Sequence, residues 1–565
     1  MKKVAIIFLL YLFSANLVNA QLSKFHWAKN MGGTLMDEGN SLALDSNGNI
    51  YITGWFQGNA QFGIGIKTIN LYARGESDIF VAKLDSYGDL LWVKQMGGPL
   101  NEGGYSICID SHSNVYVGGI FNGTVDFDPS VKEYNLNSVG HYDIFIAKID
   151  PLGNFIWAKQ FGGTSIDHLT SLVTDRTGNI YAAGYFSGTS DFDPGNHFFN
   201  LSSEGTDSTF DSFIAKLDPS GNFLWAKRIG GDSQDLLHSL TLDYLGNLYA
   251  IGSFIGTSDF NPGTDTFILS SQTNRDIYVE KLDSSGDFVW AKQMGGTGRD
   301  IGYSIAVDLI GNVYTTGSFE GSADFDPSPN VFNLTGYGQE DIFICKLDAQ
   351  GNFIWANRMG GASSDAGLSL TIDSAANIYI IGWFSDTADF APGVETYNLT
   401  SKGREDVFIT KLDSSGSFKW AERMGGREDD MGFDIVVDVA GSIYSIGYFV
   451  SDGDFSLDEK IAYNLTSSGS HDIFIKKYSP FIVIPQGNIF YVYPNPCSKL
   501  INLALTKTFS HSMLRISNLL GQLVIKNDDF NGNSCTIEIS HLASGLYFIE
   551  VDDWEITHRS LFIKE

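Results

Sequence analysis

The sequence predicts an all-β fold, in which a seven-bladed β-propeller with four-stranded blades is followed by a small Ig-like β-sandwich. Three observations predict the propeller: a recurring tryptophan motif, four short strands in each repeat, and a chain that begins with a fourth strand and ends with a repeat of three strands. The motif reads Trp-Ala-Lys-x-Met-Gly-Gly or a near copy, with its tryptophans 65, 65, 68, 65, 65 and 65 residues apart. They are Trp27, Trp92, Trp157, Trp225, Trp290, Trp355 and Trp420. So regular a period indicates one supersecondary unit repeated along the chain.

Residues 1–20 have the pattern of a secretory signal peptide. Lys2 and Lys3 precede an apolar run at 4–13, and the small residue Ala20 stands before the expected cleavage point. An apolar run of about ten residues is too short to cross a bilayer as a helix, which takes about 20. We therefore expect Sec-dependent export, and no transmembrane segment in the mature chain.

The chain is strongly acidic, with 66 Asp and Glu residues against 36 Lys and Arg residues and a formal net charge of −30. Such a surface repels phosphate backbones, and no basic stripe interrupts it, so nucleic acid is excluded as a partner. Of the four cysteines, Cys108 and Cys345 lie in apolar strand patterns and are expected to be buried free thiols. A disulfide between Cys497 and Cys535 stays open, because sequence does not show whether they are close.

Residues 40–96 show how one repeat is expected to fold. Residues 41–45 and 50–56 form two strands joined by an Asn-Gly turn, which is a strong hairpin signal. Residues 78–85 and 90–96 add a third and a fourth strand. Because no helical periodicity lies between them, the repeat predicts one blade of four antiparallel strands. The extra length of the repeat lies between the second and third strands.

The phase of the repeats predicts a closed ring. The chain begins with a fourth strand alone, at 24–31, and its last repeat has three strands, at 434–438, 442–449 and 472–478. In a closed ring the N-terminal strand completes the last blade and hides two strand edges that an open stack exposes. We therefore predict that residues 21–480 form a seven-bladed propeller closed by this strand.

The repeats resemble a known family, the bacterial β-propeller repeat called SBBP. The resemblance covers about residues 24–478 and is carried by Trp-Ala-Lys, by Gly-Gly and by Asp-x-x-Gly-Asn-x-Tyr-x-x-Gly, which recur along the chain. It implies a propeller fold. It implies no particular activity and names no ligand.

A separate domain is expected at residues 491–565, after a linker at 481–490. Six alternating segments there predict short strands that can build a small antiparallel sandwich. These segments are 500–505, 513–517, 522–525, 535–539, 546–551 and 560–563.

This tail resembles the C-terminal sorting domain of the type IX secretion system. The matching residues are Tyr493, Pro494, Asn495, Pro496, Gly521, Gly545, Tyr547 and the basic end at Lys564. The resemblance implies the type IX secretion machinery as a partner. It also implies that the protein is secreted or held on the outer cell surface of a Gram-negative bacterium, after Sec export to the periplasm.

A carboxylate stands four residues after the second glycine of each Gly-Gly pair. The seven residues are Asp37, Glu102, Asp167, Asp235, Asp300, Asp365 and Asp430. If their loops line one mouth of the channel, they form an acidic ring that can hold a cation or a basic ligand. The alternative, which we favour, is structural: each carboxylate accepts backbone N–H bonds in its own turn.

A second acidic set lies in the Asp-Phe-Asp-Pro loops. Their paired oxygens suggest Ca²⁺ sites, but the loops lack the further ligands of an EF-type loop, and a turn pinned by a buried Phe is the favoured interpretation. The residues are Asp126, Asp128, Asp191, Asp193, Asp324 and Asp326. Ca²⁺ is the one cofactor that the sequence suggests.

One position of the second strand varies between repeats and carries an aromatic residue in four of them. These residues are Trp55, Tyr185, Trp383 and Tyr448. Variation inside a rigid repeat marks a candidate binding surface, where aromatic rings can stack on sugars or peptides. Packing between blades explains the same residues equally well.

Motifs that carry catalysis are missing: there is no His-Glu-x-x-His, Cys-x-x-Cys, Gly-x-Ser-x-Gly or phosphate loop. We therefore assign no catalytic residue, and favour a non-enzymatic binding or adhesion scaffold whose ligand is a polysaccharide or a surface protein. Two alternatives stay open. One is a secreted polysaccharide hydrolase or lyase with its site in the propeller channel, and the other is a structural envelope protein.

Overall fold

The computed structural model describes most of the chain and contains only β-strands there. The described residues are 24–63, 67–206, 209–393, 395–456, 462–479, 490–493, 500–518, 522–543, 545–552 and 557–564. Backbone contacts separate a unit of Phe25–Ser479 from a second unit that contains Pro480–Glu565. The prediction of an all-β fold is confirmed. The expected signal peptide lies outside the described residues.

One repeat forms a four-stranded antiparallel sheet in the order β2-β3-β6-β7. Its strands are β2 (Asp37–Leu44), β3 (Ile50–Phe56), β6 (Asp78–Leu84) and β7 (Leu90–Met96). In the turn between β2 and β3, Asp45 Oδ1 accepts the backbone N–H groups of Asn47 and Asn49, each at 2.9 Å. Strand β2 starts earlier than the sequence pattern indicates, because a bulge between Gly39 and Ser41 lets the pairing continue to Asp37.

The same strand order recurs along the chain. The strands are β8 (Glu102–Ile109), β9 (Val115–Phe121), β12 (Asp143–Ile149) and β13 (Phe155–Gly163); β14 (Asp167–Thr174), β15 (Ile180–Phe186), β18 (Asp211–Leu217) and β19 (Phe223–Gly231); β20 (Asp235–Leu242), β21 (Leu248–Phe254), β24 (Asp276–Leu282) and β25 (Phe288–Gly296); β26 (Ile301–Val307), β27 (Val313–Phe319), β30 (Asp341–Leu347) and β31 (Phe353–Gly361); and β32 (Asp365–Ile372), β33 (Ile378–Asp389), β34 (Asn398–Leu412) and β35 (Phe418–Met424).

The extra length in each repeat forms a short hairpin rather than an open loop. The separate hairpins are β4 (Asn59–Phe62) with β5 (Ile69–Tyr72), β10 (Thr124–Asp126) with β11 (Asn135–Asn137), β16 (Thr189–Asp191) with β17 (Asn200–Ser202), β22 (Thr257–Asp259) with β23 (Ile268–Ser270), and β28 (Ser322–Asp324) with β29 (Asn333–Thr335). A hairpin of this kind pairs with the fourth strand of the preceding sheet, as Gly162 does with Asp191 in β16. The hairpins therefore tie neighbouring sheets together.

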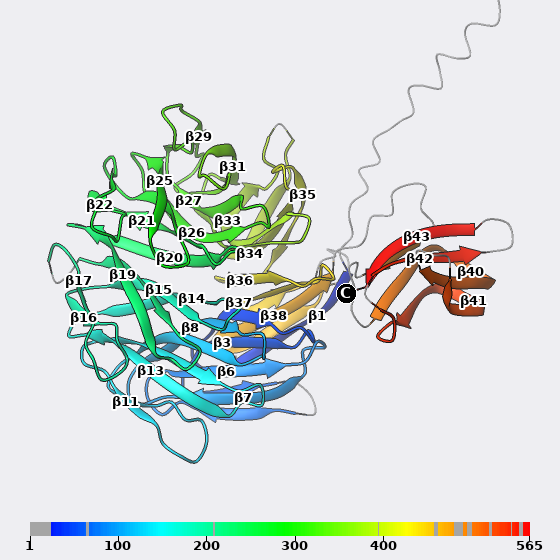
Figure 1. The fold of residues 1–565 in the computed structure, drawn as a ribbon, viewed down its shortest axis with the longest axis horizontal. Coiled ribbons are helices and arrows are strands. Elements are labelled where there is room, and N and C mark those ends of the chain that lie inside the picture. Colours follow the sequence, from blue (N-terminus) through cyan, green and yellow to red (C-terminus); the bar gives the residue numbers. More distant parts are fainter. Residues whose placement is uncertain are drawn as a thin grey trace, which may run out of the picture. The chain divides into compact units, whose positions relative to one another are not determined.

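The N-terminal strand β1 (Lys24–Gly33) joins the last sheet of the unit. That sheet runs β36 (Met431–Val437), β37 (Ile443–Asp454), β38 (Asn464–Ser479) and β1, and then continues into the hairpin β4-β5. Figure 1 shows β1 in blue beside β38 in orange. The rings of Phe25 and Tyr463 lie 4.7 Å apart, and the equivalent rings of Phe223 and Phe199 lie 4.8 Å apart. Strand β1 thus occupies the place of a fourth strand.

The sheets of this unit surround a common centre, toward which their first strands face (Figure 1). Strand β2 contacts β8 on one side and β36 on the other, so the beginning and the end of the unit are neighbours. Lysines reinforce the junctions: Lys148 Nζ donates to the carbonyl oxygen of Pro219 at 3.0 Å. Lys477 Nζ makes the same type of bond to Ser86 at 3.0 Å, across the junction of the last and first sheets.

The apolar core lies between the faces of neighbouring sheets. In one cluster Ile52 and Ala82 pack with Ile446 and Ile475, again joining the first and last sheets of the unit. The repeated tryptophans lie farther out and contact the next sheet, as Trp92 does by donating from Nε1 to the carbonyl oxygen of Pro151 at 3.2 Å. Burial between sheets is the main stabilising contribution in such a fold.

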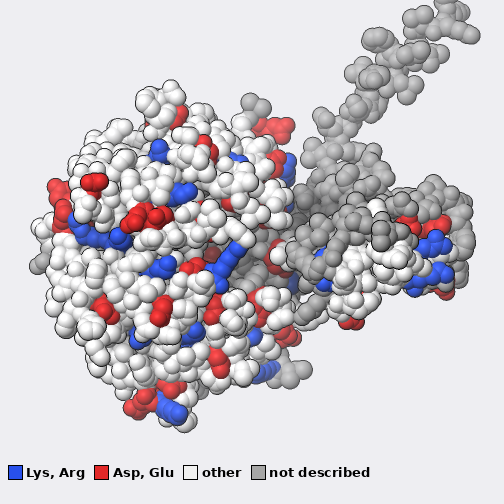
Figure 2. Space-filling view, in the orientation of Figure 1, with Lys and Arg blue, Asp and Glu red and all other residues white. Residues whose placement is uncertain are grey.

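Charge is spread over this unit. Figure 2 shows basic and acidic side chains interspersed on the visible face, with no patch of one sign that covers several sheets. Some acidic residues are paired locally, as Arg228 is with Asp211 at 2.7 Å and Arg423 is with Asp406 at 2.6 Å.

The described residues of the C-terminal unit form five strands in one antiparallel sheet, in the order β39-β40-β42-β43 with β41 also on β40. The strands are β39 (Phe490–Tyr493), β40 (Leu500–Asn518), β41 (Leu523–Glu538), β42 (Gly545–Asp552) and β43 (Thr557–Lys564). Segments 500–505 and 513–517, expected as two strands, lie within β40. Shifts of register along β40 and β41 let one long hairpin replace the expected shorter strands.

Candidate ligand-binding face

The Gly-Gly pairs lie at one end of every sheet. The pairing of Asp37 with Phe56, of Phe56 with Asp78 and of Ile79 with Met96 places the starts of β2 and β6 beside the ends of β3 and β7. The Gly-Gly pair follows β7 at this end. We call this end, with its equivalents in the other sheets, the Gly-Gly face. The opposite end carries the turns such as 45–49, and we call it the turn face.

The seven carboxylates expected as an acidic ring lie at the Gly-Gly face but are buried, each at most 2% exposed. Each accepts the backbone N–H of the second glycine of its Gly-Gly pair. The distances are 2.6 Å at Asp37, 3.0 Å at Glu102, 2.8 Å at Asp167 and at Asp235, 2.7 Å at Asp300 and at Asp365, and 2.6 Å at Asp430. These are the contacts that the structural interpretation requires.

Each of these carboxylates has a second buried carboxylate beside it, which the sequence did not reveal. The second set is Asp78, Asp143, Asp211, Asp276, Asp341, Asp406 and Asp472, the first residue of the third strand in its repeat or the equivalent position, each at most 1% exposed. The first glycine of the pair lies between the two acids. A Cβ on Gly162 would lie 2.6 Å from Asp143 Cγ and 2.9 Å from Asp167 Oδ2. The sequence carries a signal for these residues, because an Asp begins the third strand of each repeat, as Asp-x-Phe or, at Asp276, as Asp-x-Tyr.

Burial controls the protonation of these pairs. It raises the pKa of Asp167 to about 7 and of Asp235 to about 8, and the neighbouring carboxylates Asp143 and Asp211 add to the effect. Asp211 Oδ1 is buried without a hydrogen-bond partner among the described residues. A proton held by the pair removes the repulsion between two adjacent buried charges.

The four expected aromatic residues all lie in the row next to the Gly-Gly end. Trp55 pairs with Glu38 of the first strand, and Tyr185 pairs with His168. The rings of His168 and Tyr185 are stacked at 5.0 Å. Trp383 and Tyr448 occupy the same row on β33 and β37, opposite Ala366 and Met431. The ring of Tyr448 stacks on His471 at 4.1 Å.

Trp55 lines a hollow of about 300 Å³ at the junction of two sheets. Tyr105 of β8 and Tyr142, just before β12, supply further rings, and Glu38 and Asn101 supply polar groups. The ring of Tyr105 lies 4.8 Å from that of His168, so aromatic surface continues toward the next sheet. A concave site lined by aromatic side chains with a few polar groups is typical of small-ligand binding. Sequence reasoning found Trp55 and Glu102 but did not bring them together or find Tyr105 and Tyr142, because spacing along one repeat does not show which residues meet at the junction of two sheets.

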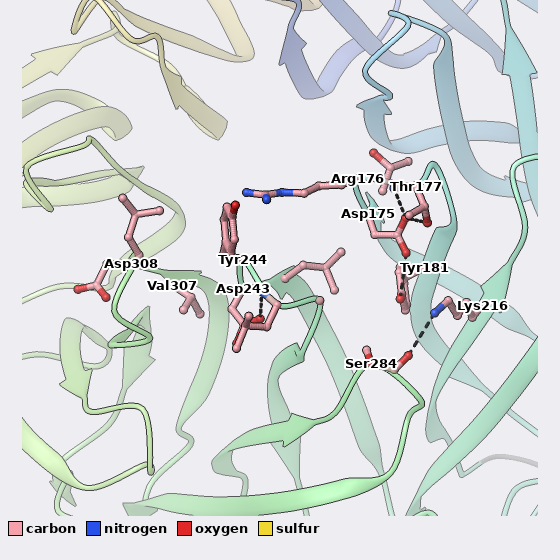
Figure 3. Close-up of a pocket in the computed structure, with 15 residues that line it drawn as sticks. Asp175, Arg176, Thr177, Tyr181, Lys216, Asp243, Tyr244, Ser284, Val307 and Asp308 are labelled. Carbon is pink, nitrogen blue, oxygen red and sulfur yellow. Dashed lines mark hydrogen bonds between the residues drawn. The ribbon is translucent and has the colours of Figure 1, made fainter. Parts of the chain in front are cut away.

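A second hollow, of about 490 Å³, lies on the turn face (Figure 3). Arg176, which lines this hollow, lies over the ring of Tyr244, with the guanidinium carbon 3.3 Å from the ring centroid. The carboxylates of Asp175 and Asp243 cap their own turns, accepting the N–H of Thr177 at 2.9 Å and of Leu245 at 2.8 Å. The polar groups of this hollow are thus largely engaged within the turns.

The Asp-Phe-Asp-Pro loops are held by their own backbone. Asp126 Oδ1 accepts the N–H groups of Asp128 at 3.1 Å and of Tyr134 at 2.9 Å. Asp191 and Asp324 make the same pair of bonds, to Asp193 and Phe199 and to Asp326 and Phe332. In the described part of the chain, no group of three or more His, Cys, Asp or Glu residues could hold a metal ion.

The residues of the sorting resemblance are only partly described. Tyr493 lies in β39, Gly545 and Tyr547 in β42 and Lys564 in β43, while Pro494, Asn495, Pro496, Gly521 and Cys497 lie outside the described residues. The hydroxyl of Tyr547 donates to the carbonyl oxygen of Ala543 at 2.8 Å. The described cysteines Cys108, Cys345 and Cys535 are not disulfide-bonded. The described residues also include no helix long and apolar enough to cross a membrane.

Two families match the chain. The β-propeller repeat family, SBBP, matches residues 27–59, 156–192 and 289–318. The secretion system C-terminal sorting domain family matches residues 491–565. The chain therefore contains β-propeller repeats and ends in a type IX sorting domain, as the resemblances predicted. The sorting domain indicates secretion or a cell-surface location.

The chain is also similar to two curated proteins. An uncharacterized WD repeat-containing protein of Acanthamoeba polyphaga mimivirus is 24% identical over 544 residues, which cover 81% of this chain and 38% of that protein. The regulatory protein FlaEY of Caulobacter vibrioides is 22% identical over 354 residues, which cover 59% of this chain and 33% of that protein. The chain thus spans between a third and two fifths of the length of these relatives.

Among solved structures, a structural genomics protein of unknown function from Bacteroides thetaiotaomicron is similar at 12% identity. The match covers 81% of this chain and 98% of that chain, with a TM-score of 0.22. A score this low supports no conclusion about shared fold or function.

Proposed function

We propose that this protein is an exported, non-enzymatic binding and adhesion scaffold whose Gly-Gly face holds a polysaccharide. Its scaffold is a seven-bladed β-propeller closed by strand β1. The observation that carries the proposal is the hollow formed by Trp55, Tyr105 and Tyr142, with Glu38 and Asn101 at its wall. Aromatic faces provide apolar contact area for sugar rings, and the polar groups supply hydrogen bonds that fix their orientation.

The repeats themselves support a binding role for this face. At the position of Trp55 the other repeats carry Ile120, Tyr185, Ser253, Ser318, Trp383 and Tyr448, whereas the neighbouring buried carboxylates recur in every repeat. Positions that maintain a repeat recur, while a site is grafted onto positions that the scaffold leaves free. Two of the variable positions, Trp55 and Ile120, line the hollow.

The carboxylates of the hollow favour binding over hydrolysis. Glycoside hydrolysis ordinarily uses two carboxylates placed on either side of the scissile bond. Of the two that line the hollow, Glu102 is 2% exposed and accepts the N–H of Gly98 at 3.0 Å. Glu38 alone is open to a ligand, and it also lies 3.3 Å from Nδ1 of His471.

A glycan array probed with the purified protein tests the proposal. We expect binding to at least one polysaccharide, without new reducing ends, and a loss of about tenfold or more in affinity for Trp55→Ala and for Tyr105→Ala. Tyr244→Ala, on the turn face, is the matched control and should bind like the wild type. Absence of glycan binding, or unchanged affinity in both hollow variants, would contradict the proposal. New reducing ends would favour the hydrolase or lyase alternative.

The route of export is part of the proposal. We infer that residues 1–20 direct the chain through Sec and that residues 491–565, folded as an Ig-like sandwich, direct it across the outer membrane. Deleting residues 491–565 should leave the propeller in the periplasm, as fractionation of the cells would show. Normal secretion of the truncated chain would contradict this role. The proposed binding requires no cofactor, and Ca²⁺ at the Asp-Phe-Asp-Pro loops remains a prediction.

A further inference from the structure

Arg275 lies directly before β24 on the Gly-Gly face and has only uncharged partners in the described structure. Its guanidinium donates to Oγ of Ser253 at 3.3 Å and to the side-chain carbonyl of Gln234. A guanidinium has five N–H donors. Donors therefore remain for a ligand, in a protein whose net charge of −30 offers many carboxylates as alternative partners.

In the next sheet the two equivalent positions hold side chains of opposite charge, which pair with each other. Arg299 stands at the position equivalent to Gln234, and Glu340 stands at the position equivalent to Arg275. Arg299 Nη1 lies 2.5 Å from Glu340 Oε1, so this second pair is neutral overall. In the sheet of β20 and β21 the same two positions hold Gln234 and Arg275, and one positive charge is left over.

Arg275 is partly buried among groups of both charges. Burial and the nearby Arg299 guanidinium lower the pKa of Arg275, and the Asp235 carboxyl acts in the opposite direction. Burial, together with the charge of Arg275, lowers the pKa of His238 to about 3, so this imidazole is neutral. His238 Nε2 is buried without a hydrogen-bond partner among the described residues, and its ring lies 5.3 Å from that of Tyr303.

Arg275 is partly exposed, whereas Ser253, to which it donates, is fully buried at the position at which other sheets carry Trp55 or Tyr185. The guanidinium is therefore the group of the two that a ligand can reach. A partly buried guanidinium that has no ion-pair partner among the described residues is stabilised when an anion binds it.

We propose that Arg275 binds an anionic group of the ligand, a carboxylate or a sulfate ester, so that the polysaccharide held at the Gly-Gly face is acidic. The planar guanidinium fork matches the oxygens of either group. This inference rests on the proposed function, because it assigns the charge of the ligand that this face binds.

Binding of the full mature protein to polygalacturonate, dextran sulfate and dextran tests the inference, with affinities measured at two salt concentrations. We expect an acidic polymer to bind at least tenfold more tightly than dextran, with an affinity that falls as salt rises. Arg275→Gln should lose about tenfold or more of that affinity and leave binding of a neutral glycan unchanged. Arg176→Gln, on the turn face, is the matched control and should bind like the wild type. The two acidic polymers distinguish a carboxylate from a sulfate ester.

The outcomes separate this inference from the proposed function. If neutral and acidic polymers bind equally and Trp55→Ala weakens both, the proposed function stands and the inference is wrong. If Arg275→Gln abolishes binding of the acidic polymer while Trp55→Ala does not weaken it, the inference stands and the hollow is not the site. Equal affinities of Arg275→Gln and the wild type overturn the inference, and a lack of binding to every polymer contradicts both. Unchanged melting temperatures confirm that each variant is folded.

Discussion

The buried carboxyl pairs are the residues whose chemistry responds most directly to pH. Burial raises the pKa of Asp37, Asp300, Asp365 and Asp430 to about 7 and of Glu102 to about 8. In the unfolded chain these groups titrate near their ordinary values of about 4. Between about pH 4 and pH 8 the folded state therefore binds more protons than the unfolded state. The stabilisation is complete below the unfolded pKa and is lost as pH rises through the folded pKa.

We therefore predict that the melting temperature of the protein falls as pH rises from 5 to 8, which calorimetry at matched ionic strength would measure. Asp235→Asn removes one titrating group and should reduce the slope. Asp89→Asn, at an exposed turn where the carboxylate pairs with Lys29 at 2.7 Å, should leave the slope unchanged. A melting temperature that rises over this range would show that the pairs are not protonated in the folded state.

The glycine between each pair makes a second prediction at the residue scale. Gly162 has a φ of 155°, and a Cβ there would lie 2.6 Å from Asp143 Cγ. Gly162→Ala should lower the free energy of unfolding by about 1–3 kcal/mol, because overpacking adds to backbone strain. Gly321→Ala is the control for strain alone, since Gly321 has a φ of 71° but nothing within 4 Å of its Cβ position. Denaturant unfolding measures both free energies. If the two variants lose the same free energy of unfolding, crowding against the carboxyl pair is not the cause of the loss at Gly162.

The sequence predicted one carboxylate of each pair and not the other, because only the first stands close to its Gly-Gly pair in the sequence. Asp37 was found because it lies at a fixed distance from its Gly-Gly pair. Its neighbour Asp472 lies at the other end of the unit and adds to the shift in the pKa of Asp37. Tyr105 and Tyr142 were missed for a similar reason, because spacing along one repeat does not show which residues meet at the junction with another.

At the scale of elements, one residue distinguishes the junction of the last sheet. Ser occupies an equivalent position of the first strand in the other sheets, at Ser41, Ser106, Ser171, Ser239, Ser304 and Ser369, whereas the last sheet has Asp434. Asp434 Oδ2 accepts the N–H of Leu42 at 2.9 Å and the hydroxyl of Ser41 at 3.1 Å, and Oδ1 accepts the hydroxyl of Ser369 at 3.0 Å. One side chain thus connects its sheet to both neighbours.

Asp434→Ala should therefore destabilise the protein by about 1–3 kcal/mol, since it leaves buried donors without an acceptor. Asp434→Ser restores the residue that the other sheets use and should cost less. Urea unfolding monitored by tryptophan fluorescence would measure both. If the Ala variant unfolds like the wild type, the bridge contributes nothing to the junction.

The elements themselves were largely predictable, and the departures have local causes. The four strands of a repeat follow from alternation and Asn-Gly turns. The hairpin β4-β5 was expected only as extra length, because its few residues carry too short a pattern, and its pairing with β1 is a long-range contact. In the tail, β40 joins two expected strands, because irregular pairing with β41 carries the ladder across residues that break the alternation.

For the whole molecule, the position of β1 beside β38 is the contact on which the proposed ring closure depends. Removing residues 24–33 takes Met31 and Trp27 out of the core cluster that joins the first and last sheets and leaves an edge of β38 unpaired. We predict that the truncated protein aggregates or melts well below the wild type, as light scattering during a thermal scan would show. A truncated protein that stays monomeric and melts like the parent would contradict closure by β1.

A crystal structure of the mature protein bound to an acidic oligosaccharide is the decisive measurement for both the ring and its binding face. We expect a closed ring of seven four-stranded sheets with β1 in the last one. We also expect a sugar ring against Trp55 and Tyr105, and a charged group on Arg275. A different number of sheets, an open arrangement, or a sugar bound only at the turn face beside Tyr244 would contradict these expectations.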